Sequence, residues 1–549
     1  MNVIHATRAV LVVLSSIGLL LTNVACKDDK KSAPVRIVTS GGSGDVGVGG
    51  IGGPGGDLLL FIDSGGDGAI DIDRSGKAPA SFTPSTPPAF DPGPNGIVID
   101  SDVTVVLATV EPALGVLYAM ANDPSLYESD DNGAIGDEPP ISSIEIESTG
   151  RLVLPLNIGV ISTAGFDFSH DVLNDGLITT VDASAFFRGS LLLTAESYRG
   201  SGAIETFGEL PGQSGGSIGV EVRTGNGYNS GHWRTFGADD PVNDGGDGGP
   251  IHFTATAGNF ASFIENTGDM DARGGSAIGL DGIGGGGGII LIQAFADVSN
   301  SGDLTTTGGD GIDLAGGAGT ITLETLYVGE VRNTGHLEAA GGWASNAPGG
   351  PGGQISLVAV GSDVRSSGCL HTYGGDAVQT DMPGGPGGGV QLAVSPGMDG
   401  VPTPAGDIWL SGAIDAGGGH GMGTGGDGGP GGPLRVAIDN SASGDDQSIF
   451  LRGYSPIEGR GGDAFEGGPG ALFLADVAAN RVDPRTGPFT SQATIDVSGG
   501  DAEPTAGASI GGPGGNVVIQ AGTISYGTVD VSGGTGFAPG PDGTATPET

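Results

Sequence analysis

The sequence predicts an all-β protein, a right-handed parallel β-helix with glycine-rich corners, and three observations support this prediction. Glycine far exceeds its average usage, with 113 glycines and 34 prolines in 549 residues. Short runs of valine, isoleucine and leucine alternate with polar residues, which is typical of strands with one buried face. Two motifs recur at an almost constant spacing, which is typical of stacked repeats.

The first motif has the form NxGxLxxxGG. It occurs as NTGDMDARGG, NSGDLTTTGG, NTGHLEAAGG and SSGCLHTYGG, and its later versions are SGAIDAGG, TIDVSGG and TVDVSGG. The final glycines of the four full copies are Gly275, Gly309, Gly342 and Gly375, so one copy follows the next after 33 or 34 residues. Collagen is excluded, because the glycines cluster instead of falling at every third position.

The second motif is a glycine-rich turn followed by a strand, as in GGDGGPIHFTA, GGGGGIILIQA and GGPGGQISLVA. Aligning its copies predicts one column of inward-facing apolar residues: Ile251, Ile290, Ile321, Ile355, Val390, Leu434 and Val517. No single unit buries its apolar face alone, so we expect equivalent strands to pair in parallel and stack, with glycines at tight corners. Repeated β-sandwiches are the alternative architecture, but they explain the short strands and not the constant period.

A polar column runs through the same repeats, formed by Asn266, Asn300, Asn333 and Ser366. Stacked amides at one corner would hydrogen-bond to one another as a ladder. The alternative is that each side chain closes only its own turn. Both interpretations are compatible with the same fold.

The repeats resemble those of bacterial filamentous-haemagglutinin-type and autotransporter adhesins, in which TIDVSGG-like and GGPGGxIxLxA-like segments alternate. The similarity covers about Ala203 to Gly534, and covers 97–202 only weakly. It implies a right-handed β-helix and a structural or adhesive surface role. The tail FAPGPDGTATPET departs from the membrane barrel of that family, so a lipid is expected to provide the anchor instead.

The N-terminus predicts export. Arg8 precedes the apolar run 9–21, and TNVAC follows that run. Ala25 before Cys26 resembles the lipobox of bacterial lipoproteins, which implies a lipid on Cys26 and anchoring at the outer membrane or cell surface. Asn23 departs from the usual leucine of that motif, which leaves plain secretion or an uncleaved anchor as alternatives.

These signals divide the chain into six predicted segments. They are a lipoprotein signal peptide at 1–25, a flexible glycine-rich tether at 26–56, a strand segment and proline-rich linker at 57–96, irregular rungs at 97–244, the regular repeat β-helix at 245–534 and a disordered tail at 535–549. With Cys26 acylated, Cys369 has no disulfide partner, so the fold depends on packing and backbone pairing.

Charge and motif searches limit the functions. The formal net charge of −44 argues against nucleic-acid binding, because phosphates would be repelled. We expect no cofactor, with calcium as the one alternative. A nonapeptide at 308–316 places Asp313 like the ligand of a calcium-binding repeat, but its solitary occurrence favours a plain corner. Glu128, Asp130 and Asn132 have calcium-loop spacing, but Pro139 stands where that loop needs glutamate, which favours a solvated acidic loop.

We expect no enzymatic activity and no closed metal site. One repeat column carries Asp271, Glu338, Asp415, Asp496 and Asp530, and recurrence is typical of a structural position. His336 and His371 fall in different columns of adjacent units, with Cys369 beside His336. The alternative function is a β-helical carbohydrate-active enzyme, a polysaccharide lyase or hydrolase, which would need carboxylates and basic residues that converge in one groove.

The surface that contacts partners is predicted from where the repeats vary. Segments of unequal length lie between successive GG pairs, at 343–348, 376–383, 420–427 and 501–510. Stacking would bring them to one side of the solenoid. Trp343 is the candidate partner-binding residue, for a glycan or a surface protein, because an exposed indole stacks well on both. The alternative is that Trp343 only covers glycine-rich corners.

Overall fold

The structure is a computed structural model in which the chain divides into two compact units, Met1–Val35 and Arg36–Thr549, and every described residue belongs to the second. The described residues are 69–72, 96–99, 101, 104–106, 143–154, 163–167, 171–180, 184–255, 261–379, 382–397, 406–421, 426–440, 449–451, 456–464, 466–479, 488–502, 510–520, 523–535 and 538–548. Cys26 and the 128–139 loop lie outside them. Among the described residues, no helix is long and apolar enough to cross a membrane.

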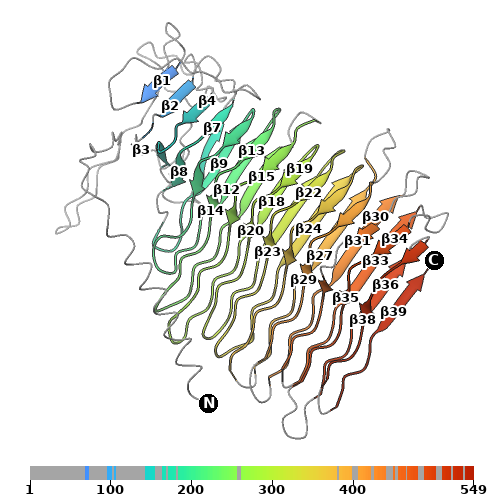
Figure 1. Cartoon of the computed structure of the whole chain (residues 1–549). Coiled ribbons are helices and arrows are strands. Elements are labelled where there is room, and N and C mark those ends of the chain that lie inside the picture. Colours follow the sequence, from blue (N-terminus) through green and yellow to red (C-terminus); the bar gives the residue numbers. More distant parts are fainter. Residues whose placement is uncertain are drawn as a thin grey trace, which may run out of the picture. The chain divides into compact units, whose positions relative to one another are not determined.

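The second unit is a right-handed parallel β-helix, as predicted. Its named strands form three sheets of 14, 13 and 12 strands, here called A, B and C, and neighbouring strands are parallel throughout (Figure 1). Parallel pairing excludes the β-sandwich alternative, which is built from antiparallel strands.

Sheet A contains, in order, β1 (Ala69–Ile72), β2 (Gly96–Ile99), β4 (Ser143–Ile146), β7 (Val172–Asn174), β10 (Tyr198–Gly200), β13 (Gly227–Asn229), β16 (Ile264–Asn266), β19 (Val298–Asn300), β22 (Val331–Asn333), β25 (Val364–Ser366), β28 (Ile408–Leu410), β31 (Ile449–Leu451), β34 (Pro488–Ser491) and β37 (Thr523–Ser525).

Sheet B contains β3 (Thr104–Val106), β5 (Arg151–Leu154), β8 (Leu177–Thr180), β11 (Ala203–Glu205), β14 (Trp233–Arg234), β17 (Met270–Asp271), β20 (Leu304–Thr305), β23 (Leu337–Glu338), β26 (Leu370–His371), β29 (Ile414–Asp415), β32 (Ile457–Glu458), β35 (Ile495–Asp496) and β38 (Val529–Asp530). Sheet C contains β6 (Thr163–Asp167), β9 (Ser190–Ala195), β12 (Ile218–Val222), β15 (Ile251–Ala255), β18 (Ile290–Ala294), β21 (Thr320–Thr325), β24 (Gln354–Val360), β27 (Val390–Ser395), β30 (Leu434–Asn440), β33 (Leu472–Ala479), β36 (Asn516–Gln520) and β39 (Thr544–Glu548).

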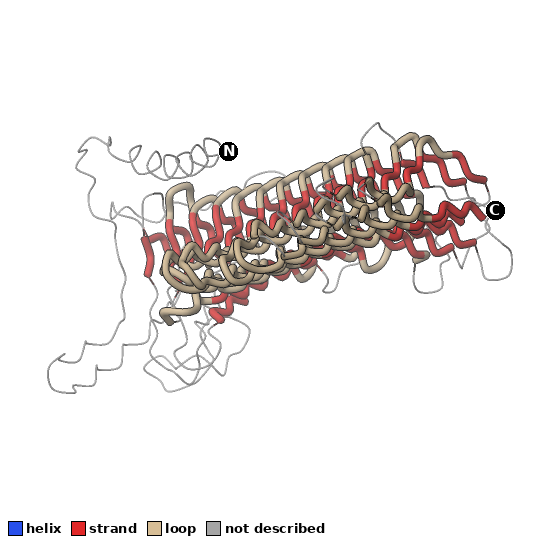
Figure 2. Tube along the Cα trace, turned by 90° about the horizontal axis from the view of Figure 1, so that it is seen from below, coloured by secondary structure: helices blue, strands red, loops and turns tan. Residues whose placement is uncertain are grey.

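From β6 onwards, each rung adds one strand to each sheet and then returns through a long glycine-rich loop. The loops run alongside one another beyond the strands, as Figure 2 shows in tan. The predicted apolar column is confirmed by the strand register, with Phe473 in the place of the irregular repeat. Its members are buried, so the core is a continuous apolar ladder inside the rungs.

The asparagine ladder is also confirmed. Asn266 Nδ2 donates to Asn300 Oδ1 at 2.7 Å, and Asn300 Nδ2 donates to Asn333 Oδ1 at 2.9 Å. Each amide also donates to the glycine carbonyl two residues later, so the ladder and the turn closure coexist. Asn229 extends the ladder by one rung, donating to Asn266 Oδ1 at 2.7 Å.

The glycine-rich loops bring neighbouring turns of the stack into close approach, at positions where a Cβ would clash. Two glycine columns face each other, one ending the first motif and one opening the second. Their backbones form one continuous chain of hydrogen bonds, in which Gly316 N–H donates to Gly309, Gly342 N–H to Gly316 and Gly350 N–H to Gly342. The same alternation runs from Gly246 to Gly540, and we call it the glycine zipper. Two backbones approach this closely because neither carries a Cβ.

The stack extends beyond both predicted limits. Thr544–Glu548 forms β39, which pairs with β36, so the prediction of a disordered tail is wrong for the described residues 538–548. At the other end, β1 already pairs with β2 inside the segment predicted as a strand and linker. A terminal strand continues a stack at little cost, because the preceding rung presents a ready-made edge.

The glycine zipper predicts an unequal response to two Gly→Ala changes. At Gly309 a Cβ would lie 2.0 Å from the carbonyl oxygen of Gly275, whereas at Gly286 the nearest atom would be 3.5 Å away, at Asp247 Oδ1. We expect Gly309→Ala to destabilise the fold by about 1–3 kcal/mol or more, and Gly286→Ala to have little effect. Denaturant midpoints followed by circular dichroism compare the two, and equal midpoints would contradict the zipper.

The asparagine ladder predicts that Asn300→Ala lowers the free energy of unfolding. Its amide is fully buried, and its removal leaves Asn266 Nδ2, Asn333 Oδ1 and Gly302 O each without one partner. We expect a loss of about 1–3 kcal/mol for each buried group left unsatisfied. Ser299→Ala, one residue earlier on the outer face of β19, is the matched control and should leave the thermal midpoint unchanged.

Candidate functional site

The variable segments between the glycine columns do stack along one edge. Isolated parallel bridges join Gly311 to Ala344, Ala344 to Ala377, and Ala377 to Gly421 in successive rungs. We call this edge the tip edge. Because the glycine zipper holds the backbone on the inner side, length and sequence vary beyond it without disturbing the sheets.

A groove of about 370 Å³ lies between the tip edge and sheet B. The groove is lined by two aromatic side chains, three carboxylates and one guanidinium: Trp343, Tyr373, Asp310, Glu338, Asp376 and Arg273. Trp343 is 41% exposed, so a large part of this residue faces solvent. We call this depression the Trp343 groove.

The floor of the groove follows from one repeat column, the residue immediately before each GG pair. Large side chains occupy this column at Arg273 and Tyr373, and small ones occupy it at Thr307 and Ala340. Because Thr307 and Ala340 are small and lie between Arg273 and Tyr373, they leave a hollow that spans two rungs. A neighbouring groove of about 460 Å³ shares Arg273, whose guanidinium stacks over Phe236 at 5.4 Å.

Trp343 occupies a column that otherwise links rungs by hydrogen bonds. In this column a side chain of one rung accepts a hydrogen bond from the backbone N–H of the next rung. The pairs, each with the acceptor first, are Asp239 and Ser276, Ser276 and Asp310, Asp310 and Trp343, Asp376 and His420, His420 and Asp463, Asp463 and Asp501, and Asp501 and Thr535. An indole has a donor but no acceptor, so Trp343 interrupts the ladder at the groove.

Asp310 and Glu338 have opposite electrostatic environments within the groove. Burial raises the pKa of Asp310, although hydrogen bonds from the backbone and side chain of Trp343 oppose that shift. The pKa of Glu338 is lowered, first by hydrogen bonding to His336 and further by Tyr373. Tyr373 donates its hydroxyl to Glu338 Oε1 at 3.2 Å, while burial, followed by the charge of Glu338, raises the pKa of Tyr373 to about 12.

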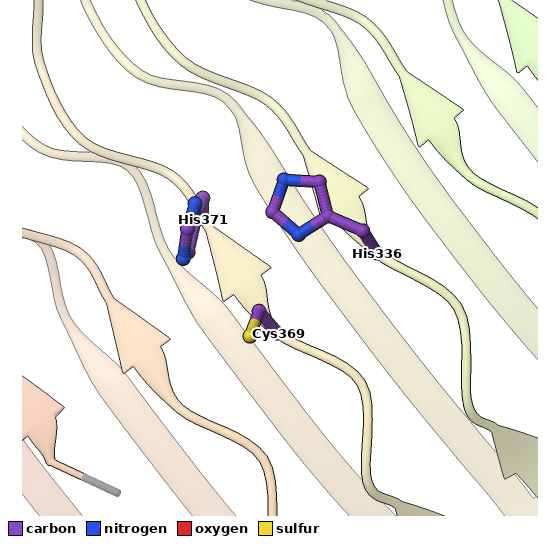
Figure 3. A group of neighbouring side chains, drawn as sticks. All are labelled: His336, Cys369 and His371. Carbon is purple, nitrogen blue, oxygen red and sulfur yellow. The ribbon is translucent and has the colours of Figure 1, made fainter.

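His336, Cys369 and His371 form a compact cluster on the outer face of sheet B (Figure 3). Their ligand atoms lie within 4.8 Å of one another, and the two imidazole rings meet edge to face with centroids 4.6 Å apart. The position of Cys369 beside His336 agrees with the sequence analysis, because Leu337 pairs with Leu370. The two histidines fall in different columns, as the sequence indicates, and their long side chains meet because they reach diagonally between rungs.

The remaining predicted residues have simpler positions. Cys26, Glu128, Asp130 and Asn132 lie outside the described residues. Asp313 is exposed on the tip edge and is not part of the described His–Cys cluster. The predicted carboxylate column is confirmed by strand register, and it also includes Thr305, His371 and Glu458.

Two features of the site were missed from the sequence. Arg273 and Tyr373 could have been found by aligning the residue before each GG pair, because that column changes size along the chain. The glycine zipper that supports the groove could not be found in this way, because glycine has no side chain from which a buried or exposed face could be predicted. Comparison with family models, with curated proteins and with solved structures found no match to this chain.

Proposed function

We propose that the protein is a non-enzymatic scaffold at the bacterial cell surface, anchored by a lipid on Cys26, that adheres to a glycan through the Trp343 groove. The interruption of the inter-rung ladder at Trp343 carries this proposal. Other rungs keep a hydrogen-bond acceptor at this position, which stabilises the stack. At Trp343 that link is replaced by a half-exposed indole in a hollow.

The groove has the chemistry that sugar recognition needs. Trp343 and Tyr373 present flat apolar rings with polar edges, which suit the faces of pyranose rings. Asp310 and Asp376 lie in the same column and offer acceptors for sugar hydroxyls. The carboxylates would repel an anionic polymer, so a neutral or amino-bearing glycan is the expected partner.

The scaffold role is supported by the regularity of the acidic positions. The Asp310 carboxylate accepts the Trp343 N–H at 3.0 Å, as equivalent aspartates do in other rungs. A group that serves the same structural contact in many rungs is not specialised for one reaction. The alternative, a carbohydrate-active enzyme, is favoured by one observation, the opposite pKa shifts of Asp310 and Glu338 in one groove.

Lipid anchoring predicts that Cys26→Ser abolishes incorporation of radiolabelled fatty acid, because the thiol is the proposed acceptor. Cys369→Ser is the control, since it removes the second cysteine of the chain and should leave the label unchanged. Label that persists in Cys26→Ser would contradict the anchor.

Glycan adhesion predicts that Trp343→Ala weakens binding by about tenfold or more on a glycan array, as expected for an aromatic anchor at the centre of a contact. Trp409→Phe changes a tryptophan on sheet A, stacked on Phe450, and should leave binding unchanged. Circular dichroism would confirm that both variants are folded.

Three results of such binding experiments would contradict the proposal. Equal glycan binding by Trp343→Ala and the parent would remove the groove from consideration. Release of shortened saccharides from the bound glycans, lost in Glu338→Gln, would favour the enzyme instead. If the protein binds a surface protein and no glycan, the tip edge would be a protein-binding surface, the other predicted partner class.

A further inference from the structure

The cluster of His336, Cys369 and His371 is distinct from the repeat pattern around it. Each of the three side chains is half-buried, and each comes from the outer face at β23 or β26. His336 and Cys369 lie in one column, where the preceding rung has Asp303 and the following rung has Ala413. His371 lies in another column, between Glu338 and Asp415. The two rungs of the cluster therefore combine two imidazoles and one thiol.

Imidazole and thiolate are the ligands that zinc and other late first-row transition metals prefer. In a tetrahedral zinc site, with Zn–S about 2.3 Å and Zn–N about 2.0 Å, ligand atoms stand about 3.5 Å apart. The three atoms here already lie within 4.8 Å of one another. The remaining contraction is about 1 Å, which small side-chain rotations of half-buried residues supply.

A carboxylate stands next to the cluster. Glu338 Oε2 lies 3.8 Å from His336 Nε2, and the other carboxylate oxygen accepts the hydroxyl of Tyr373 at 3.2 Å. Tyr373 therefore holds Glu338 in place, as second-shell partners do around metal ligands. Cys369 is a free thiol within the described residues, so its sulfur is available to a metal.

We propose that His336, Cys369 and His371 bind a zinc-class transition-metal ion, with Glu338 as the adjacent fourth donor. The ion links the rung of β23 to the rung of β26 on the outer face of sheet B. Binding deprotonates Cys369, and the thiol proton is released to water. The site shares Glu338 with the lining of the Trp343 groove, but metal binding needs no occupant in that groove, so it can be tested without a glycan.

The experiment uses the full-length chain carrying Cys26→Ser, which leaves Cys369 as its only cysteine. Co²⁺ is titrated as a spectroscopic probe in excess Mg²⁺ and Ca²⁺, which occupy the acidic surface. We expect one equivalent of Co²⁺ to produce a thiolate-to-cobalt charge-transfer band that Zn²⁺ abolishes. The absence of this band would overturn the proposal.

Variants separate the cluster from the general negative charge of the chain. Cys369→Ser should abolish the band, and His336→Gln and His371→Gln should each weaken Co²⁺ binding by more than about tenfold, the loss seen even for outer-shell partners. His232→Gln is the matched control, because this exposed histidine pairs with Asp269 in a different part of the stack and should change nothing. If Co²⁺ binds equally well to Cys369→Ser and the parent, only the acidic surface binds metal, and the proposal is wrong.

Discussion

The glycine zipper is the constraint on which the rest of the structure depends. Sheets A, B and C close only three sides of each rung, and the returning loop must cross back with small side chains only, such as the buried cluster of Ala315, Ala344 and Ala347. Its two arms are joined by backbone hydrogen bonds, as between Gly309 and Gly316. A peptide backbone pairs this way only where no Cβ intervenes, which explains why glycine recurs in both columns of the zipper. The cost in conformational entropy is offset in part by the hydrogen bonds that the zipper glycines form within and between rungs.

The zipper also determines where the candidate groove is located. The glycines of its two arms carry no side chains, so the size of the residue before each GG pair decides whether a groove forms. Ala340 and Thr307 are small residues at this position and lie between Arg273 and Tyr373. The tip edge beyond the zipper is joined between rungs by isolated bridges, such as Gly311 with Ala344 and Ala344 with Ala377, so segments of unequal length fit between the bridges without breaking a sheet. Variation at this edge therefore rests on a backbone that the repeat already supports.

The fold was predictable in detail because both motifs carry a period. The columns of Ile290 and Asn300 were placed correctly by aligning repeats, since strand register simply preserves the alignment. The predicted tail failed because its glycine motif is degenerate. Gly540 and Gly543 repeat the backbone hydrogen bonds of Gly512 and Gly515, and Thr544–Glu548 then pairs with β36. The cluster of His336 and His371 was not predictable by column, since its contacts run diagonally between rungs and depend on side-chain length. Column alignment therefore finds what repeats, whereas the candidate sites lie where the repeat is broken.

The acidic surface has the same origin as the stack. Aspartate is short enough to accept a backbone N–H from the next rung, and a charged acceptor makes that bond stronger than a neutral one would. Stacked carboxylates repel one another, and the column of Asp310 reduces this repulsion by placing Ser276, Trp343 and His420 between successive aspartates over much of its length. The inter-rung links that aspartates form in this column therefore contribute to the net charge of −44, with serine, tryptophan and histidine as spacers. Trp343 fits this alternation as a spacer, so the stack tolerates an indole there at the cost of one hydrogen bond, and that tolerance makes the position available for binding.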